Sequence, residues 1–267
     1  MYQSGLNKKS VNIAIIVPIY NEKTYISNSL NSILNQKIES NIHLHIICVF
    51  NNSSDGSKDI VTDLIEKSQK DNVFWYVKEQ TIQGIVPARN LGLETLSVIE
   101  KENNFKFDFV ANQDADDVWF SESKLQKQVD FLKDNPEIDV VGGQYLGRAK
   151  YVETKPENYI KLERRPLEHD ECLLWLLRGH NPIGNASALF RRDILYRVGV
   201  YDDFFPFVED MWFWYKVAFA GYKLSNLEED VLLYNMSNNP SYSPKFPVCL
   251  SLMFKTLIET KTNKLVF

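Results

Sequence analysis

Near the middle of the chain stands the segment Phe107-Asp108-Phe109-Val110-Ala111-Asn112-Gln113-Asp114-Ala115-Asp116-Asp117, an apolar run that leads directly into carboxylates spaced Asp-x-Asp-Asp. In an open α/β sheet, ligands bind outside the carboxyl ends of the strands, so acids at such a point face a site. Alternate acids can reach one hard cation, and Mg²⁺ is usually held by one or two carboxylates with substrate phosphates and water. For an isolated Asp-x-Asp, a solvated acidic turn is the simpler interpretation. The rest of the chain decides between the two.

Length and composition indicate a folded globular chain. The 267 residues are 44% hydrophobic and 24% charged, enough to bury a full core in one large domain or two small ones. A formal net charge of -5 and a pI near 5.5 argue against broad nucleic-acid binding, which needs a basic surface. Two short basic clusters, Arg164-Arg165 and Arg191-Arg192, could still meet a phosphate locally.

The cysteines and the hydropathy pattern favour the cytoplasm. Cys48, Cys172 and Cys249 are scattered, form no metal-ligand pair and fit packing roles in a reducing compartment. No charged-then-apolar leader opens the chain, and no apolar run approaches the length of a membrane span. We therefore expect a soluble cytoplasmic protein without a transmembrane segment.

Strands and helices alternate regularly in the first half. The run 11–17 is β-branched, as in a buried parallel strand, and Pro18 is expected to end it. The patterns that follow predict a helix over about 23–35, a strand over 44–50, a helix carrying Ile60, Val61, Leu64 and Ile65, a strand over 73–77, and a helix after Gly84. Such alternation predicts βαβ units, a parallel sheet and a nucleotide-binding type of α/β layer.

The alternation fades after the acids. Residues 147–168 are polar and contain two prolines, so we expect a mobile loop or lid there, and residues 1–10 should be frayed. The run Met211–Phe219 is apolar nearly all round and suits a buried helix with Gly221 as its C′ residue. The remaining expected elements are helices around 125–132 and 171–177, strands at 139–143, 187–190 and 231–234, and an amphipathic stretch at 250–257.

Several motifs that would assign other chemistry are missing from the sequence. No G-x-G-x-x-G follows the first strand and no Walker loop exists, so dinucleotide hydride transfer and P-loop phosphoryl transfer lose their main support. No G-x-S-x-G elbow marks a serine hydrolase. His43 and His45 alternate on a strand without a third ligand nearby, and we interpret them as ordinary residues.

Six short motifs do follow one another along the chain. They are Pro18-x-Tyr20-Asn21-Glu22, Asn51-Asn52-Ser53-Ser54-Asp55-Gly56-Ser57, Gly84-x-x-x-Ala88-Arg89-Asn90-x-Gly92, Asp114-Ala115-Asp116-Asp117, Phe190-Arg191-Arg192 and Glu209-Asp210. Over about residues 11–236 this order resembles glycosyltransferase family 2. The resemblance implies a GT-A fold, an α/β domain over 11–240 in which residues 11–117 bind a sugar nucleotide and residues 118–240 bind the acceptor. Residues 241–267 would form a tail with helical character.

The resemblance also implies roles for the nucleotide half. Pro18, Tyr20 and Glu22 match the loop that flanks the base and ribose, although punctuation at a strand end explains Pro18 and Tyr20 equally well. Asn51 stands where the family usually has an aspartate, and its amide could still bond a base edge with less charge. Arg89 matches the family's A-R-N-x-G arginine, where a cation beside the pyrophosphate is electrostatically sensible.

The metal site follows from the same resemblance. Asp114 and Asp116 match the metal-binding pair, with Asp114 nearer the ribose and Asp116 on an Mn²⁺ or Mg²⁺ ion, while Asp117 could simply cap the next turn. Many relatives carry a histidine after the last strand, and here the segment Tyr234-Asn235-Met236-Ser237 has none. Either water completes the metal shell or the metal is held more weakly.

The resemblance places the catalytic base at Asp210, with Glu209 orienting the loop or bonding an acceptor hydroxyl. Capping and the helix dipole also explain acids at a helix N-terminus. The aromatic residues nearby could form an apolar wall that stacks on sugars and raises the pKa of the base; these are Phe204, Phe205, Phe207, Trp212 and Trp214.

The sequence thus predicts a metal-dependent inverting glycosyltransferase. It would move a sugar from a nucleotide-diphosphate donor, with UDP favoured, to a hydroxyl of a glycan, glycoconjugate or protein. Two alternatives stay open: a non-catalytic carbohydrate-binding or assembly domain on a decayed enzyme fold, and a nucleotidyltransferase, which would be expected to show a Gly/Arg/Lys-rich loop where this chain has residues 18–22. The oligomeric state is also open, with a homodimer among the options.

Overall fold

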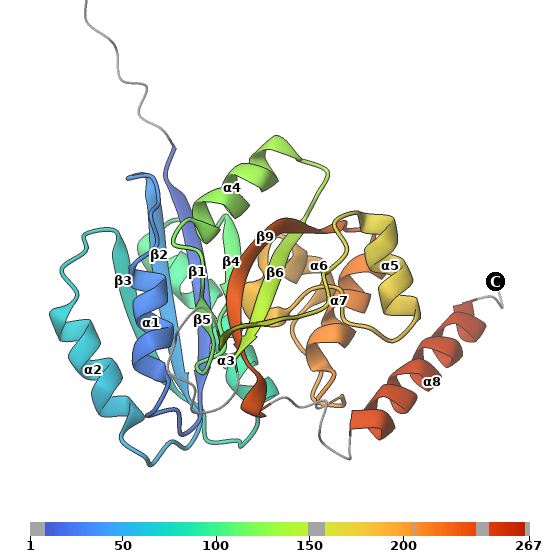
Figure 1. Ribbon diagram of the computed structural model, residues 1–267, viewed down its shortest axis with the longest axis horizontal. Helices are drawn as coiled ribbons and strands as arrows, with labels where there is room; N and C mark the ends of the chain where they lie inside the picture. Colours follow the sequence, from blue (N-terminus) through green and yellow to red (C-terminus); the bar gives the residue numbers. More distant parts are fainter. Residues whose placement is uncertain (1–8, 149–157, 206, 239–245, 265–267) are drawn as a thin grey trace, which may run out of the picture.

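The computed structural model describes residues 9–148, 158–205, 207–238 and 246–264 of the chain. One nine-stranded sheet runs through these residues in the order β3-β2-β1-β4-β8-β6-β9-β5, with β7 beside β6 (Figure 1). The strands are β1 (Val11–Ile19), β2 (Ile42–Phe50), β3 (Val73–Glu79), β4 (Phe109–Asn112), β5 (Val118–Trp119), β6 (Val140–Arg148), β7 (Ile160–Lys161), β8 (Leu189–Arg191) and β9 (Leu224–Asn235).

The first half is the parallel α/β layer that the sequence predicts. β1 pairs in parallel with β2 and β4, and β2 pairs in parallel with β3. The expected end of the first strand at Pro18 is wrong, because β1 continues to Ile19 with Pro18 opposite Val49. The pairing of β1 with β4 stops at Ile16, so β4 needs no backbone donor from Pro18.

The second half of the sheet is mixed rather than parallel. β8 runs antiparallel to both β4 and β6, and β5 runs antiparallel to β9, whereas β6 and β9 are parallel. The predicted strand at 231–234 is only the end of β9. The earlier part escapes prediction because the polar run 228–230 crosses an irregularity where the register against β6 shifts between Gly143 and Tyr145. β5 and β7 are two residues each, too short to show a period.

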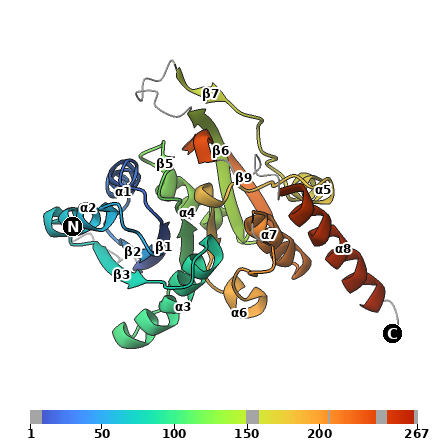
Figure 2. The same cartoon turned by 90° about the horizontal axis from the view of Figure 1, so that it is seen from below.

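Helices cover both faces of the sheet (Figure 2). The helices are α1 (Ile26–Leu34), α2 (Ser57–Lys67), α3 (Ile85–Asn103), α4 (Lys124–Asp134), α5 (His169–Leu177), α6 (Ile194–Val198), α7 (Glu209–Phe219) and α8 (Phe246–Lys264). One buried cluster joins the sheet to α1, α2 and α4, and the other joins it to α3, α5, α6 and α7. Alternate residues of β1 enter opposite clusters, Ile15 one and Ile16 the other, which explains why this strand is apolar throughout.

Several expectations about the second half can be compared with the structure. α7 is the predicted buried helix, and Gly221 follows it with φ of +91°. The expected helical stretch at 250–257 lies within α8. Of the expected loop at 147–168, residues 149–157 lie outside the described residues, and β7 of the remainder pairs with β6. Most of the expected frayed N-terminus, residues 1–8, also lies outside them.

The cysteines and the helices agree with the sequence analysis where the structure describes them. Cys48 and Cys172 are buried and Cys249 is half-buried, all as free thiols, which confirms their packing role. No helix in the described part of the chain is long and apolar enough to cross a membrane.

The motif glycine on α3 generates the first prediction. A Cβ at Gly92 would lie 2.6 Å from Cγ2 of Ile16 and 3.5 Å from Cγ2 of Val49, so α3 can approach β1 and β2 only with glycine there. We expect Gly92→Ala to lower the free energy of unfolding by about 1–3 kcal/mol, the usual cost of overpacking, measured by urea denaturation. Glu94→Ala, at an exposed position of the same helix, should stay within about 0.5 kcal/mol. An equal effect of both variants would contradict this.

Candidate active site

The candidate residues gather where the carboxyl ends of β1 and β4 meet the N-terminus of α7. Arg89 of α3 has its side chain 6% exposed, and its Nη2 lies 2.8 Å from Oδ1 of Asp114. Its Nη1 lies 2.6 Å from Oε1 of Glu209. Burial alone would lower the pKa of Arg89, but Asp114 and Glu209 outweigh it and raise the pKa. Arg89 is therefore a permanent cation that ties the predicted nucleotide half to the predicted acceptor half.

Carboxylates concentrate beside this ion pair. Burial, followed by Asp116, Asp55 and Asp114, raises the pKa of Glu22 to about 8. Oδ2 of Asp116 accepts a hydrogen bond of 3.2 Å from Nδ2 of Asn235. The sequence-predicted acids Asp114 and Asp116 thus lie within electrostatic reach of Glu22, and they make its carboxyl group harder to ionise.

Asp117 has a larger role than the turn cap considered from sequence. It is 1% exposed, and its Oδ1 accepts a hydrogen bond of 2.7 Å from the backbone N–H of Asn235 at the end of β9. Its Oδ2 is buried without a hydrogen-bond partner in the described structure. Burial, then Asp116 and Asp114, raises the pKa of Asp117. Asp117 therefore joins β9 to the acidic turn, where ionisation of its carboxyl group is disfavoured.

The acidic turn suits a divalent cation that the protein holds only in part. Among the described residues, no three His, Cys, Asp or Glu side chains converge as a ready-made metal site. Mg²⁺ and Mn²⁺ take oxygen ligands, and Mg²⁺ commonly uses one or two carboxylates plus substrate phosphates and water. Ionisation of Glu22 is disfavoured by burial and by the neighbouring Asp116 and Asp114, and such a cation would relieve this. The donor set fits a metal that binds together with a diphosphate.

Asn51 organises a loop instead of presenting its amide to solvent. It is 2% exposed, its Nδ2 donates to the carbonyls of Gln80 and Ile82 at 2.9 and 2.7 Å, and its Oδ1 accepts from the N–H of Gly84 at 2.7 Å. These bonds shape the loop that leads into α3 and Arg89. A direct contact between Asn51 and a nucleobase would have to break some of them.

Pro18 and Tyr20 have different surroundings. Pro18 is buried within β1, as expected for a structural residue. Tyr20 is 52% exposed directly after the strand and is free to meet a ligand. The next loop residue, Asn21, has φ of +54°, and it accepts a hydrogen bond from the N–H of Ser54 at 2.8 Å. The loops after β1 and β2 are therefore held together at the edge where the acids lie.

Asp210 lies half-buried in the first turn of α7. Nδ2 of Asn181 donates to its Oδ2 at 2.7 Å, and the N–H of Met211 donates to its Oδ1 at 2.7 Å. Burial, then Glu209, raises the pKa of Asp210 to about 7, although Arg89 opposes this. A carboxyl group with a pKa near neutrality is suited to accept a proton at physiological pH.

The predicted aromatic wall is mostly wrong. Trp214 and Phe205 are buried in the core, because α7 is enclosed on most sides and needs large apolar residues there. Trp212 is half-buried, with its Nε1 donating to Oδ2 of Asp202 at 2.5 Å. Phe204 alone of the five is a largely exposed ring, at 72%. Phe207 has φ of +75°, a strained conformation for a bulky residue, and lies two residues before Glu209.

Sequence reasoning missed two polar contacts of the site. Asn181 bonds the candidate base, and Asn235 bonds both Asp116 and Asp117. The sequence offered a signal for Asn235, since it lies in the segment where relatives carry a histidine. Asn181 carried no such signal, because its position follows from the packing of the loop after α5.

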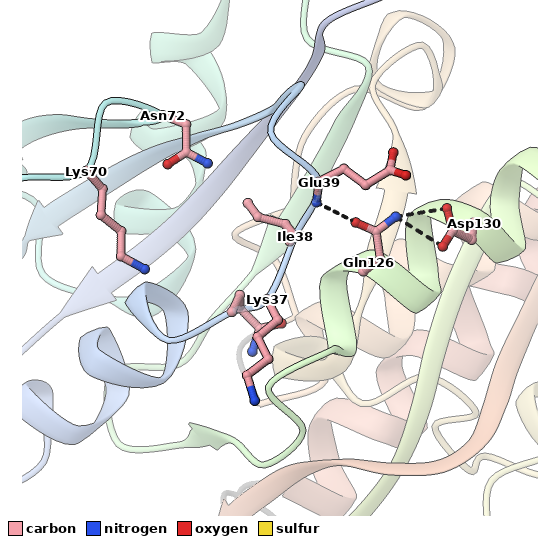
Figure 3. A pocket seen from close by; sticks show the side chains of 8 residues that line it. Lys37, Ile38, Glu39, Lys70, Asn72, Gln126 and Asp130 are labelled. Carbon is pink, nitrogen blue, oxygen red and sulfur yellow. Dashed lines mark hydrogen bonds between the residues drawn. The ribbon is translucent and has the colours of Figure 1, made fainter. Parts of the chain in front are cut away.

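An open depression elsewhere on the surface contains none of these residues. It lies near the amino ends of β2 and β3, at the opposite edge of the sheet from the acids (Figure 3). Its lining residues are Gln36, Lys37, Ile38, Glu39, Lys70, Asn72, Gln126 and Asp130. Because it gathers no reactive constellation, we place the candidate site at the carboxyl edge.

An α/β sheet with an acidic turn at its carboxyl edge, a buried arginine and an acidic pair at a helix start is typical of GT-A-type glycosyltransferases. The family model described as "Glycosyl transferase family 2" matches residues 14–199. The chain belongs to this family, which confirms the resemblance stated from its sequence motifs.

The curated relatives are moderately similar. An uncharacterized glycosyltransferase of Haemophilus influenzae is 28% identical over 241 residues, covering 86% of this chain and 67% of that protein. The minor teichoic acid biosynthesis protein GgaA of Bacillus subtilis is 28% identical over 199 residues, covering 74% of this chain and 41% of that protein. The chain spans only 31% of a Rickettsia conorii glycosyltransferase.

Solved structures confirm the fold. S. aureus TarS 1-349 in complex with UDP aligns with a TM-score of 0.59 at 18% identity, covering 91% of this chain and 65% of that one. The mannosyltransferase PcManGT of Pyrobaculum calidifontis, in complex with GDP-Man and Mn²⁺, aligns with a TM-score of 0.65 at 19% identity, covering 95% and 65%. The likeness shows the mostly parallel GT-A sheet with flanking helices.

The Arg89 ion pairs generate the second prediction. Arg89→Met leaves the carboxylate of Glu209 buried without its cation, so we expect the free energy of unfolding to fall by about 3–5 kcal/mol in urea denaturation. The matched control is Lys58→Met, which removes an exposed ion pair with Glu79 and should cost about 1 kcal/mol at most. A loss no larger than the control's would mean that the Arg89 pairs are solvated.

Proposed function

We propose that the protein is a metal-dependent inverting glycosyltransferase that uses a nucleotide-diphosphate sugar, most simply a UDP-sugar. The acceptor would be a hydroxyl of a glycan, glycoconjugate or protein. The observation that carries the proposal is the chain of contacts from Asp114 through Arg89 to Glu209, beside Asp210. This chain fixes a donor-side acid and an acceptor-side base relative to each other. The solved neighbours support the donor class, since they form complexes with UDP, UDP-GlcNAc and GDP-Man.

The donor would bind at the edge formed by the loops after β1, β2 and β4. Tyr20 is exposed there for the nucleotide, while Asn51 acts through the loop it holds. Asp114 and Asp116 would hold Mn²⁺ or Mg²⁺, which supplies Lewis-acid stabilisation of the diphosphate leaving group. Arg89 adds a fixed positive charge whose orientation does not change during the reaction.

The acceptor would meet Asp210 on the other side of the anomeric carbon. The acceptor oxygen forms the new bond to that carbon, its proton passes to the Asp210 carboxylate, and the diphosphate leaves with the electron pair of the broken bond. Glu209 is held by Arg89 and would position the start of α7. Proton acceptance is favoured because burial has already raised the pKa of Asp210 to about 7.

A panel of sugar nucleotides tests the proposal as a whole. Slow hydrolysis of one donor in the presence of Mn²⁺ would support a transferase, whereas release of pyrophosphate from a nucleoside triphosphate would indicate a nucleotidyltransferase. Absence of both reactions, with carbohydrate binding retained, would indicate a non-catalytic domain.

The third prediction concerns Asp116. Asp116→Asn removes the ligand charge without opening a core cavity, so we expect it to abolish transfer while the circular dichroism spectrum and melting temperature stay close to wild type. Wild-type activity should be lost in excess EDTA and restored by Mn²⁺. Wild-type turnover of the variant in excess EDTA would refute metal dependence at this position.

The fourth prediction concerns Asp210. We expect Asp210→Asn to keep its affinity for UDP in calorimetry and to lose transfer by about 10²-fold or more, the contribution typical of a general base. Because Asp210 is protonated below its pKa, wild-type kcat/KM should rise with pH through about 7, and the variant's residual activity should lack this rise.

Glu209→Gln is the companion variant for Asp210→Asn. It keeps the size of the side chain but weakens the pair with Arg89, so reduced stability should accompany any loss of rate. If Glu209→Gln is inactive and stable while Asp210→Asn transfers normally, the roles are reversed. If both transfer normally, the base lies elsewhere.

A further inference from the structure

The basic pair Arg164-Arg165 lies in the extended segment between β7 and α5, and its two side chains have different surroundings. Nη1 of Arg164 lies 2.6 Å from Oδ1 of Asp230, in an exposed ion pair. Arg165 is half-buried, and no carboxylate in the described part of the chain pairs with it. Within the described residues, its positive charge therefore has no acidic partner.

The guanidinium of Arg165 is fixed by aromatic rings and by a loop. Its Cζ lies 4.6 Å from the ring centroid of Tyr145 on β6 and 5.3 Å from that of Trp175 on α5. Its Nη1 donates to the carbonyl of Asn181 at 2.7 Å, and its Nε is buried without a hydrogen-bond partner in the described structure. The buried Nε is out of reach of a ligand, but the guanidinium as a whole is only half-buried and carries further N–H donors. Such a rigidly held group can bind an anion at its accessible side, because a planar fork loses little entropy on binding.

The same loop connects Arg165 to the candidate base. Asn181 accepts from Arg165 through its carbonyl and donates through its side chain to Oδ2 of Asp210 at 2.7 Å. The phenol of Tyr145 lies within electrostatic reach of both groups. Burial raises its pKa to about 12, Arg165 lowers this pKa, and Asp210 raises it. Arg165 is thus connected to Asp210 through a single residue, Asn181. The contacts that tie Arg89 to Asp114 take no part in this connection.

The other arginines of the basic clusters are already neutralised. Nε of Arg191 lies 3.8 Å from Oδ1 of Asp139, and Nε of Arg192 lies 3.2 Å from Oε1 of Glu100. Arg191 also donates to the carbonyls of Ile138 and Leu132. Of the two clusters noted in the sequence, Arg165 is the member that forms no ion pair with a described carboxylate.

We propose that Arg165 forms an acceptor subsite for an anionic group, a phosphate ester or a carboxylate, carried close to the hydroxyl that Asp210 deprotonates. This rests on the proposed function for the role of Asp210. The subsite selects charged acceptors, because a neutral acceptor would leave the half-buried guanidinium without its anion. The test below distinguishes a phosphate ester from a carboxylate as the bound group.

The test measures sugar binding by calorimetry to protein saturated with UDP and Mn²⁺, so that the diphosphate site is filled. Glucose 6-phosphate and glucuronate probe the phosphate and the carboxylate, and glucose is the neutral reference. A charge-assisted hydrogen bond predicts that at least one anionic sugar binds about tenfold or more tightly than glucose. Equal binding of all three sugars, or no measurable binding of either anionic sugar, overturns the proposal.

Three variants locate the effect. Arg165→Gln should reduce the preference for the anionic sugar to less than about threefold, whereas Arg165→Lys should keep part of it because the charge remains. Arg164→Gln is the matched control, since it removes the same charge one residue away, and it should leave the preference unchanged. A preference that survives Arg165→Gln, or that Arg164→Gln removes equally, overturns the proposal. If Arg165→Gln fails to fold, Arg165→Lys and the control decide.

The affinity for UDP and the rate of donor hydrolysis, measured on the same preparations, separate this proposal from the proposed function. The affinity for UDP should be unchanged in Arg165→Gln, because the acceptor subsite takes no part in UDP binding. If UDP does not bind wild type, the proposed function fails, and titration of the anionic sugars without UDP still reports on Arg165. If UDP binds and the donor is hydrolysed, but no anionic sugar binds more tightly than glucose, only the proposal of the subsite fails.

Discussion

The buried guanidinium of Arg89 connects parts of the chain that are 25 and 120 positions away, Asp114 and Glu209. Removing three charges from water is costly, and it is tolerated only where each finds its partner at close range. The neighbours of Arg89 on α3 serve the same junction. Asn90 exchanges two hydrogen bonds with the backbone of Tyr201, and Gly92 allows the close contact with Ile16. The A-R-N-x-G segment therefore supplies packing and hydrogen bonds at this junction as well as the positive charge of Arg89.

The two halves of the sheet position different parts of the candidate site. Parallel strands bring the loops after β1, β2 and β4 to one edge, which explains where the acids lie. The antiparallel strand β8 then brings the segment before it beside β4, where Asn112 donates to Asn185 and Tyr201 at 3.0 and 2.8 Å. This polar network positions the segment that leads to α7. The position of Asp210, the proposed base, is thus set by the half of the sheet that departs from simple alternation.

The sequence predicted the parallel strands, the acidic turn and the buried α7 because each leaves a local pattern. It did not predict the roles of Asn51 and Asp117, because their partners lie about 30 and 118 positions away and a single polar residue shows no periodicity. It also misplaced Trp214, since exposed and buried aromatic residues look alike in a helix that is apolar all round. Long-range hydrogen bonds and enclosure by several elements are properties of the packed chain.

The charge balance of the site favours a donor that brings its own cation. The positive charge of Arg89 is already shared between Asp114 and Glu209, so it cannot by itself neutralise an incoming diphosphate. The raised pKa values of Glu22 and Asp117 show that a further negative charge at the same edge is unfavourable. A bare diphosphate would meet net repulsion there, whereas its complex with a divalent ion would be attracted. The acids and the absence of a three-ligand cluster among the described residues therefore favour the same arrangement, in which metal and donor bind together.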